Sequence, residues 1–559
     1  MSTPKSPILA AITSARSEYV EALHSRSQIR HIEPGANVGD EDLLAEIGYK
    51  QELRRHYSTI QVFGIAFAIM GVVPAITNTM NIGLEAGPAG MVWGWFCAGF
   101  FVLSIGISMT FLGSSIPTSG GLYYWTNYYA PDSLRVPLSF MIGCANSLGL
   151  FSGLCGIANG VSTQLLSAVY VAKDGNFEIT DEKLYGVFAA CVVLDVIIVC
   201  CLSSTNTRVL QAVSIVINCF LIVLFLIAVP VGVHSKDFDY NSAKWVFTHF
   251  ENARNWSMGW SFMLSWTPCV WAIGGFDSVI YCSEEAKNAQ RSIPFGIIGS
   301  ILTVWIVGFC VIITAVFCIK DGDVAGVLDS DTGTAMAQII YNALGKQWCI
   351  AFMSLIVLAN NLMACSILVG TSRQVWAFAR DEGLPIVYNF VKYINPKYPV
   401  PYRATGFAGI ICLLLGLLIL LGPIGSNALF SMAVLSTTLA WCMPVFLVLL
   451  PVGRSRFVPG PFYWGKTLST IINILTCVWA LYVIIMSSFP NDKAPSGTTM
   501  NYSSMVNIGV WIFSLIYYYI HGYKVYNGPK SNLTEESIDA SVMRDEYNIE
   551  DSKIDKETK

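Results

Sequence analysis

SFMLSWTPCVWAIGGFDSVIYCSEEAKNAQRSIP, at residues 261–294, is the stretch of this chain that most clearly indicates its fold. It begins with an apolar run long enough to cross a membrane, which contains two adjacent glycines, Gly274 and Gly275, and one carboxylate, Asp277. A charged side chain inside the hydrocarbon costs at least ~2.5–3.5 kcal/mol, so it normally faces a partner or a water-filled cavity. Irregular backbone at membrane depth is tolerated only where it is packed in protein or lines a cavity. We therefore interpret this stretch as a broken transmembrane helix at a solute site.

The composition of the whole chain is typical of an integral membrane protein. Of its 559 residues, 54% are hydrophobic and 13% are charged, whereas about 25% are charged in a soluble chain. A bilayer span needs about 20 apolar residues, and we mark twelve such runs, taking the long one at 137–170 as a single tilted helix. This count excludes a seven-helix receptor. The predicted spans are 58–80, 88–113, 137–170, 184–203, 209–233, 261–283, 294–319, 347–372, 404–422, 428–450, 467–490 and 501–520.

The basic residues predict the orientation of the chain. An even number of spans places the N-terminal tail (1–57) and the C-terminal tail (521–559) on the same side of the membrane. That side carries 25 of the 33 lysines and arginines, which leaves 8 for the other side. Positive residues favour the cytoplasm, so we expect both tails to be cytoplasmic.

The ionisable groups inside the predicted spans exclude several classes of membrane protein. The predicted spans contain no lysine, arginine or histidine, and their only acids are Asp195 and Asp277. An intramembrane enzyme would need an acid, a base and a nucleophile in one pocket, imidazole-based metal or haem sites need histidine, and voltage sensors use intramembrane arginines. These classes are therefore excluded. We expect no cofactor, no metal and no nucleic-acid partner, and we leave the oligomeric state open.

The uncompensated negative charge indicates the kind of solute. An amine or a permanent cation would be charge-matched by Asp277, and an ammonium over an indole face gains ~0.5–2 kcal/mol. Trp271 lies six residues before Asp277 and is a candidate for that contact; packing against lipid or core is the alternative. A solute carboxylate would instead need exposed backbone N–H groups at the start of a half-helix.

The first span contains a second predicted break. It reads AIMGVVPAITNT, in which Pro74 lacks a backbone donor and disfavours helical geometry at Val73, with Gly71 just upstream. Two interrupted segments, each the first of a five-helix set, are the sequence signature of an inverted-repeat transporter. On spacing alone, we predict a first repeat at 58–233, a second at 261–450, and two further helices at 467–520.

Several motifs carry a family resemblance between about Leu43 and Pro529. The chain resembles the amino acid–polyamine–organocation superfamily, and within it the fungal GABA-permease branch. The PTSGGLYYW and RDEGLP elements are similar to superfamily-wide cytoplasmic loop signatures, and the LLAEIGYKQEL entry points to the fungal branch. The matching runs are LLAEIGYKQELRRHYSTIQVFGIAFAIMG (43–71), VWGWF (92–96), SSIPTSGGLYYWTNYYAP (114–131), FDS (276–278), SEEAKNAQRSIPFGI (283–297), SRQVWAFARDEGLP (372–385) and PGPFYWGK (459–466).

The resemblance implies a fold and a site. Members of the superfamily have two inverted five-helix repeats plus two helices, and they hold substrate between broken helices 1 and 6. In related exchangers a helix-6 tryptophan covers the substrate and a glutamate six residues later senses protons; Trp271 and Asp277 match these positions, with Asp replacing Glu. Many members bind an α-carboxylate with a Gly-Ser-Gly-Ile turn, where this chain has MGVVPAI. This difference favours a solute whose amine and carboxylate are far apart, or one without a carboxylate.

The candidate site residues follow from both arguments. Asparagines at helix interfaces often serve as interhelical hydrogen-bond partners. This role is the alternative for Asn146, Asn360 and Asn361. We assign no role to Asp195. The predicted substrate-binding residues are Gly71, Val72, Pro74, Asn146, Trp271, Gly274 and Gly275, with Asp277 for proton coupling and Asn360, Asn361 and Trp441 as further pocket candidates.

We expect a secondary active permease that imports GABA or a related ω-amino acid or amine. Some proton-driven relatives carry a lysine in helix 5, which span 5 of this chain lacks. Asp277 is therefore the candidate proton carrier. A buried carboxylate can load and release a proton as access alternates between the two sides of the membrane. Polyamine, choline, thiamine or biotin-precursor transport is the alternative within the superfamily. A non-transporting nutrient sensor on the same fold is the alternative outside it. Of the plasma and vacuolar membranes, we favour the plasma membrane.

Overall fold

The structure, a computed structural model, describes part of the chain. The described residues are 44, 53, 55–202, 207–236, 238–253, 255–394, 400–490, 493–495 and 500–530. The chain divides into two compact units, one formed by Met1–Arg54 with Pro529–Lys559 and the other by Arg55–Gly528. All helices named below belong to the second unit, and most of the two predicted tails lies outside the described residues.

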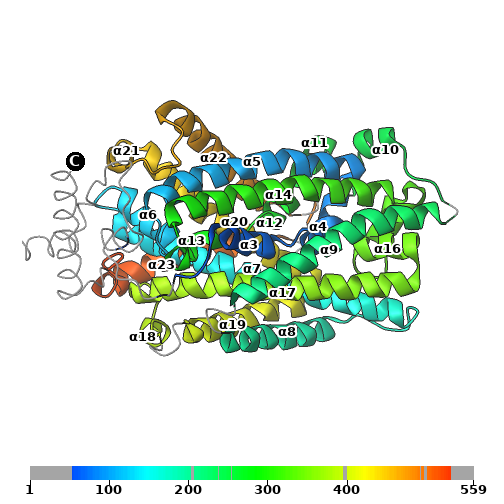
Figure 1. The fold of residues 1–559 in the computed structure, drawn as a ribbon, viewed down its shortest axis with the longest axis horizontal. Helices are drawn as coiled ribbons and strands as arrows, with labels where there is room; N and C mark the ends of the chain where they lie inside the picture. The colour runs from blue at the N-terminus through cyan, green and yellow to red at the C-terminus, as the bar shows by residue number, and fades with distance from the viewer. Residues whose placement is uncertain are drawn as a thin grey trace, which may run out of the picture. The chain divides into compact units, whose positions relative to one another are not determined.

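The described residues form helices and no named strand, which confirms an all-α membrane protein. Eleven helical segments in this part of the chain are long and apolar enough to cross a membrane, and Figure 1 shows that the long helices run along a common direction. They match eleven of the twelve predicted spans. The segments are Thr59–Leu84 (α3 and α4), Gly87–Ser115 (α5), Arg135–Ala172 (α7), Asp181–Cys201 (α8), Thr207–His234 (α9), Ala289–Phe317 (α14), Lys346–Arg380 (α17), Tyr402–Leu421 (α19 and η3), Pro423–Leu449 (α20), Lys466–Met486 (α22) and Ser503–Ile520 (α23).

The long run at 137–170 is one helix, as predicted. Helix α7 extends over 38 residues, or about 57 Å at 1.5 Å per residue, well beyond the ~30 Å hydrocarbon core. It packs against α17, α20 and α8, so it lies at the centre of the bundle. The apolar side chains of α8, α9, α22 and α23 are largely exposed on one face, as expected for helices that contact lipid.

The first span is broken, but the break falls at Gly71 rather than at Pro74. Helix α3 (Thr59–Met70) ends at Gly71, whose φ of +33° is left-handed, and α4 (Val72–Leu84) begins directly afterwards. Pro74 lies in the first turn of α4, where a backbone N–H would have no intrahelical acceptor, so the missing donor costs the helix little. Val73 is therefore helical, contrary to the expectation from the residue before a proline.

The sixth span is the most irregular part of the fold. It consists of α11 (Met258–Leu264), α12 (Thr267–Ala272), an unwound segment at 273–277, α13 (Ser278–Tyr281) and the 3-10 turn η1 (Ser283–Glu285). None of these helices is long enough to span a bilayer alone. Because α12 contacts α4 and α13 contacts α3, the two broken spans lie side by side along their lengths.

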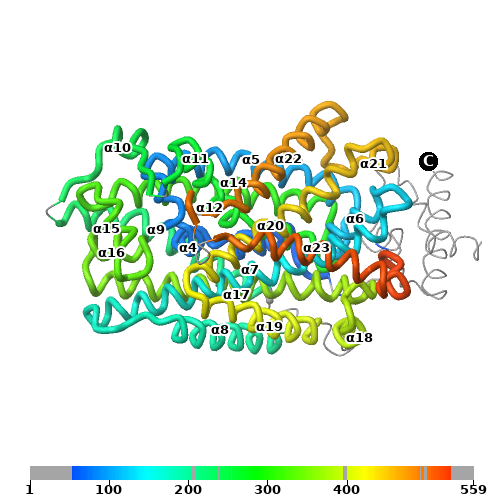
Figure 2. Tube along the Cα trace, turned by 180° about the vertical axis from the view of Figure 1, so that it is seen from behind, coloured from blue at the N-terminus to red at the C-terminus, as the bar shows by residue number. Residues whose placement is uncertain are grey.

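Short helices lie beyond the spans at both ends of the bundle. One end carries α6 (Gly121–Tyr129), α18 (Tyr388–Val391) and α21 (Pro451–Arg456); by the predicted orientation this is the cytoplasmic end. The opposite end carries α10 (Ala243–Thr248), α15 (Val324–Leu328) and α16 (Ala335–Leu344), as Figure 2 shows.

Candidate functional site

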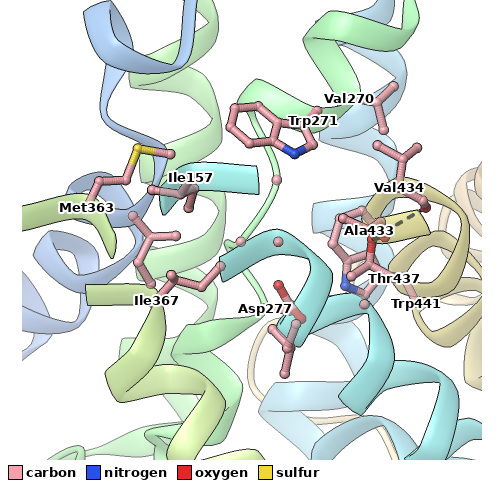
Figure 3. A pocket seen from close by; sticks show the side chains of 16 residues that line it. Ile157, Val270, Trp271, Asp277, Met363, Ile367, Ala433, Val434, Thr437 and Trp441 are labelled. Atoms are coloured by element: carbon pink, nitrogen blue, oxygen red, sulfur yellow. Dashed lines mark hydrogen bonds between the residues drawn. The ribbon is translucent and has the colours of Figure 1, made fainter. Parts of the chain in front are cut away.

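A cavity lies where the two broken spans meet. It offers about 50 Å³ to the centres of water-sized groups, whereas one buried water needs ~10–15 Å³. It therefore has room for a few small groups. Its wall combines the unwound part of the sixth span with α3, α7, α17 and α20 (Figure 3). The lining residues are Ile69, Gly149, Leu150, Gly153, Ile157, Val270, Trp271, Gly274, Gly275, Asp277, Met363, Ile367, Ala433, Val434, Thr437 and Trp441.

Asp277 is the only one of these lining residues with an ionisable carboxylate or base. Its side chain is fully buried, and its Oδ2 accepts a hydrogen bond of 2.6 Å from the Tyr281 hydroxyl. Asn146 of α7 in turn donates to that hydroxyl at 2.8 Å. Oδ1 of Asp277 has no hydrogen-bond partner within the described protein. The chain thus fixes one carboxylate oxygen and leaves the other buried without a partner beside the cavity.

Trp271 forms one boundary of the cavity. Its ring packs edge-on against Phe430 of α20, with ring centroids 4.9 Å apart. A second cavity, of about 60 Å³ by the same measure, lies beyond it towards the end of α22, and Trp271 and Val434 line both. In Figure 3 the indole lies on the opposite side of the unwound segment from Asp277. Trp271 therefore separates the central cavity from an outer one.

A buried cluster of charges closes the other side. Glu285 of η1 forms an ion pair with Arg373 of α17 at 2.9 Å, and each side chain is 1% exposed. Glu284 pairs with Arg380 at 3.2 Å. All four side chains lie at the end of the bundle assigned to the cytoplasm.

The backbone before α3 reinforces this closure. The N–H groups of His56 and Tyr57 donate to the Glu285 carbonyl at 2.9 and 3.0 Å, and the Lys287 N–H donates to the Tyr57 carbonyl. The start of the first span is thereby tied to the end of the sixth. Buried ion pairs and backbone hydrogen bonds therefore join the first span, the sixth span and α17 at the end of the bundle that the predicted orientation assigns to the cytoplasm.

The structure brings together part of the predicted site. Trp271, Gly274, Gly275, Asp277 and Trp441 line the cavity. Asn146 lies behind the wall, bonded to Tyr281.

The first-span candidates Gly71, Val72 and Pro74 fall outside the lining, and Ile69 takes their place. Met363 covers the turn at Gly71, because a Cβ added at this glycine would lie 3.0 Å from the Met363 sulfur.

The two asparagines of α17 also lie outside the lining. Asn360 donates to Gln164 of α7 at 3.1 Å, and Asn361 donates to Asp195 of α8 at 2.8 Å. Successive residues of a helix point about 100° apart, so one turns towards α7 and the other towards α8. Both make interhelical hydrogen bonds, the alternative set out for them above. Asp195 is buried at this α8–α17 contact, away from the cavity.

Several residues that line the cavity or bond to its wall were missed by the sequence analysis. Tyr281 lies four residues after Asp277, and this spacing on a helix could have suggested the contact. Thr437, Met363 and Ile367 stand in uniformly apolar helices whose periodicity does not distinguish a cavity face from a lipid face. The glycines of α7 at 149 and 153 keep the wall open, since a Cβ at Gly149 would lie 2.6 Å from the Thr437 methyl carbon.

The chemistry available in the cavity is binding rather than bond making. No group of three metal-ligating side chains occurs among the described residues. The lining provides one acid, two tryptophans and unwound backbone, but no nucleophile paired with a base. Fold and cavity together are those of a membrane transporter, with a candidate solute site between two interrupted helices.

Comparison with known proteins establishes the family. Residues 57–513 match the family described as amino acid permease. The chain is 47% identical over 520 residues to the GABA-specific permease of Saccharomyces cerevisiae, covering 93% of this chain and 90% of that one. It is 31% identical over 503 residues to an uncharacterised amino-acid permease of Schizosaccharomyces pombe, covering 89% of each. It is 28% identical over 504 residues to the amino-acid permease BAT1 homolog of Oryza sativa subsp. japonica, covering 88% and 95%. The chain belongs to the amino acid permease family and is an integral membrane transporter, not an enzyme.

Gly275 provides a first test of the broken helix. Its φ is +86°, and an added Cβ would lie 2.6 Å from the Ile69 side chain. We expect Gly275→Ala to lower the free energy of unfolding by about 1–3 kcal/mol, because a side chain strains this backbone conformation. Gly259→Ala is the control, since nothing lies within 4 Å of its added Cβ. Thermal unfolding of the two purified variants would disprove the account if their midpoints were equal.

Proposed function

We propose that this permease imports GABA or a related ω-amino acid together with a proton. The observation that carries the proposal is the buried Asp277, whose Oδ1 has no partner in the described protein and which is the one acid lining the cavity. The 47% identity to a GABA-specific permease supports the choice of solute.

The site is suited to a primary amine. The ammonium group pairs with Asp277 Oδ1 and approaches the Trp271 face; a charge-assisted hydrogen bond contributes about 1.5–3 kcal/mol, and the indole contact adds ~0.5–2 kcal/mol. The carboxylate takes the unwound backbone at Gly275 and Phe276, whose N–H groups have no backbone acceptor among the described residues. The covered turn at Gly71 is less available to an α-carboxylate, because Met363 lies against it. A separated amine and carboxylate fit this arrangement.

Asp277 is also the proposed proton carrier. In one facing state the ionised carboxylate pairs with the ammonium group through Oδ1 and then takes a proton on Oδ2, while Oδ1 still accepts from the ammonium. The Tyr281 hydroxyl then accepts from the protonated Oδ2 and donates instead to Asn146 Oδ1, which lies 3.0 Å away. In the other facing state the proton and the solute both leave. Tyr281 holds Oδ2 by a hydrogen bond and Asn146 holds the Tyr281 hydroxyl, so the change of protonation is confined to one carboxylate in a fixed position. Imported protons supply the driving force, so uptake is faster at pH 5 than at pH 7 outside the cell.

An organic cation without a carboxylate is the second candidate solute. It is favoured by one observation: no lysine, arginine or histidine is among the residues that line the cavity. A polyamine or choline would satisfy Asp277 and Trp271 and would leave no anion to be neutralised. We further propose the plasma membrane as the location, with both termini in the cytoplasm.

Uptake measurements distinguish these solutes. Cells that lack their own permeases and express this chain are supplied with radiolabelled GABA at pH 5 and pH 7, with unlabelled putrescine, choline, thiamine or 5-aminolevulinate as competitor. The proposal predicts saturable uptake that is faster at pH 5 than at pH 7. Of the four competitors, only 5-aminolevulinate, which is an ω-amino acid, should inhibit this uptake. Absence of GABA uptake despite surface expression would reject GABA as the solute, and inhibition by putrescine or choline would favour the cation.

Trp271 is expected to cover the bound amine. Trp271→Ala joins the central and outer cavities and removes the indole contact, so we predict a rise in KM of about 2- to 30-fold and a fall in accumulation. Trp271→Phe keeps an aromatic ring and should lose less. Trp348→Ala, which removes a tryptophan that is 56% exposed, is the control. An unchanged KM in Trp271→Ala would remove this residue from the site.

A further inference from the structure

A third cavity lies at the predicted cytoplasmic end of the bundle and shares no lining residue with the central cavity. It is formed where the last turns of α5 and α20 meet α21 and the first two turns of α22. The centres of water-sized groups can occupy about 40 Å³ of this cavity, which is enough for a few such groups. One wall is apolar, with Phe111, Val448 and Phe457 among its residues.

The other wall contains buried polar atoms without partners. Ser469 and Asn473, on successive turns of α22, both line the cavity and are 3% and 7% exposed. Ser469 Oγ and Asn473 Oδ1 have no hydrogen-bond partner within the described residues. Leaving such a group unpaired costs about 1–3 kcal/mol. Two unpaired polar atoms on one wall therefore indicate a bound group that satisfies them.

The mouth of the cavity is basic. Arg454 of α21 and Lys466, the first residue of α22, line it, and neither forms an ion pair with any described residue. The N-terminus of α22 faces the same region, and unpaired N–H groups at a helix start favour anions. Trp464, two residues before α22, is 43% exposed, as is common for tryptophan at the level of lipid headgroups.

We propose that this cavity binds the headgroup of an anionic phospholipid from the cytoplasmic leaflet. The phosphate lies between Arg454, Lys466 and the start of α22. One ester carbonyl of the glycerol accepts from Ser469 Oγ, and the other accepts from Asn473 once its side-chain amide is turned to present the NH2 group. The acyl chains leave beside Leu468, which is 48% exposed. The exposed basic residues, the buried polar side chains and the exposed Leu468 match the phosphate, the glycerol and the acyl chains of this ligand. The cytoplasmic leaflet is also the one that carries anionic lipids. The proposal is independent of which solute the permease imports.

The test is lipid binding to the full-length protein purified in mild detergent, measured by native mass spectrometry. The probes are palmitoyl-oleoyl phosphatidylserine, the phosphatidylcholine with the same chains, and inorganic phosphate. We expect phosphatidylserine to bind more tightly than phosphatidylcholine. Arg454→Gln with Lys466→Gln should weaken phosphatidylserine binding by about 10- to 30-fold, because each basic residue near an anionic surface contributes about fivefold.

Two further variants keep the test decisive. Lys287→Gln with Arg291→Gln removes the same charge from exposed residues before and within the first turn of α14 and should leave binding unchanged. Ser469→Ala keeps every charge and should weaken phosphatidylserine binding by about 2- to 10-fold, the contribution of one hydrogen bond. Equal binding of the two lipids, or wild-type affinity in both cavity variants, would overturn the proposal. Displacement of phosphatidylserine by millimolar inorganic phosphate would overturn it in favour of a soluble anion.

Discussion

Replacing Asp277 with asparagine is expected to abolish the accumulation of GABA against its gradient. The amide cannot release a proton, so coupling is lost, and it carries no charge to pair with the ammonium group. Loss of one charge-assisted hydrogen bond should weaken solute binding by about 10- to 100-fold. The measurement is radiolabelled GABA uptake in intact cells across pH 5 to pH 7, for variants with matched surface expression. The remaining uptake should no longer depend on pH.

The chain supplies its own control for this prediction. Asp195 is the other buried acid in the predicted spans, and it bonds to Asn361 and Cys365 at the contact of α8 with α17. Asp195→Asn removes a buried carboxylate without touching the cavity, so it should keep the pH dependence of uptake. If Asp277→Asn accumulated GABA with wild-type pH dependence, or if both variants lost it alike, Asp277 would have no special part in coupling.

The second large effect is expected at the buried ion pairs of the predicted cytoplasmic end. Arg373→Leu leaves the Glu285 carboxylate buried without its 2.9 Å partner. Removing one member of a buried ion pair costs about 3–5 kcal/mol, whereas replacing both by apolar residues is often much less harmful. We therefore expect a large fall in the thermal midpoint of Arg373→Leu and a partial recovery when Glu285→Leu is added. Uptake should fall in both, because the pair joins the sixth span to α17.

An exposed ion pair provides the comparison. Lys346 pairs with Asp174 at 2.6 Å, but the two side chains are 36% and 72% exposed. Such surface pairs contribute about 0–1 kcal/mol, so Lys346→Gln should leave the thermal midpoint nearly unchanged. A midpoint for Arg373→Leu as high as that of Lys346→Gln would show that the buried pair does not hold this end together.

The sequence indicated the parts of the fold that depend on strong local signals. Gly274, Gly275 and Asp277 inside an apolar run marked the broken sixth span, and hydropathy located the remaining spans to within several residues. The break in the first span lies at Gly71 and not at Pro74. A proline is tolerated in the first turn of a helix, and the glycine before α4 makes the turn. Membrane helices that are apolar on every side give no periodicity from which to identify their inner face, so Met363, Ile367 and Thr437 were missed.

The buried charges at the cytoplasmic end show a second limit. Glu284, Glu285, Arg373 and Arg380 lie in segments that the hydropathy assigns to loops, and loop charges are expected in water. The structure buries them because the end of the sixth span and the end of α17 come together in three dimensions. Pairing between segments about 90 residues apart in the chain is tertiary information, which no local pattern contains.

Proton movement in reconstituted vesicles tests the central claim most directly. The purified permease is placed in liposomes that contain a pH-sensitive dye, in sodium-free buffer, and GABA is added outside. We predict that the lumen acidifies as GABA enters, that the signal vanishes in Asp277→Asn, and that it persists in Asp195→Asn. Entry of radiolabelled GABA into the wild-type vesicles with no change in luminal pH would contradict proton-coupled import through Asp277.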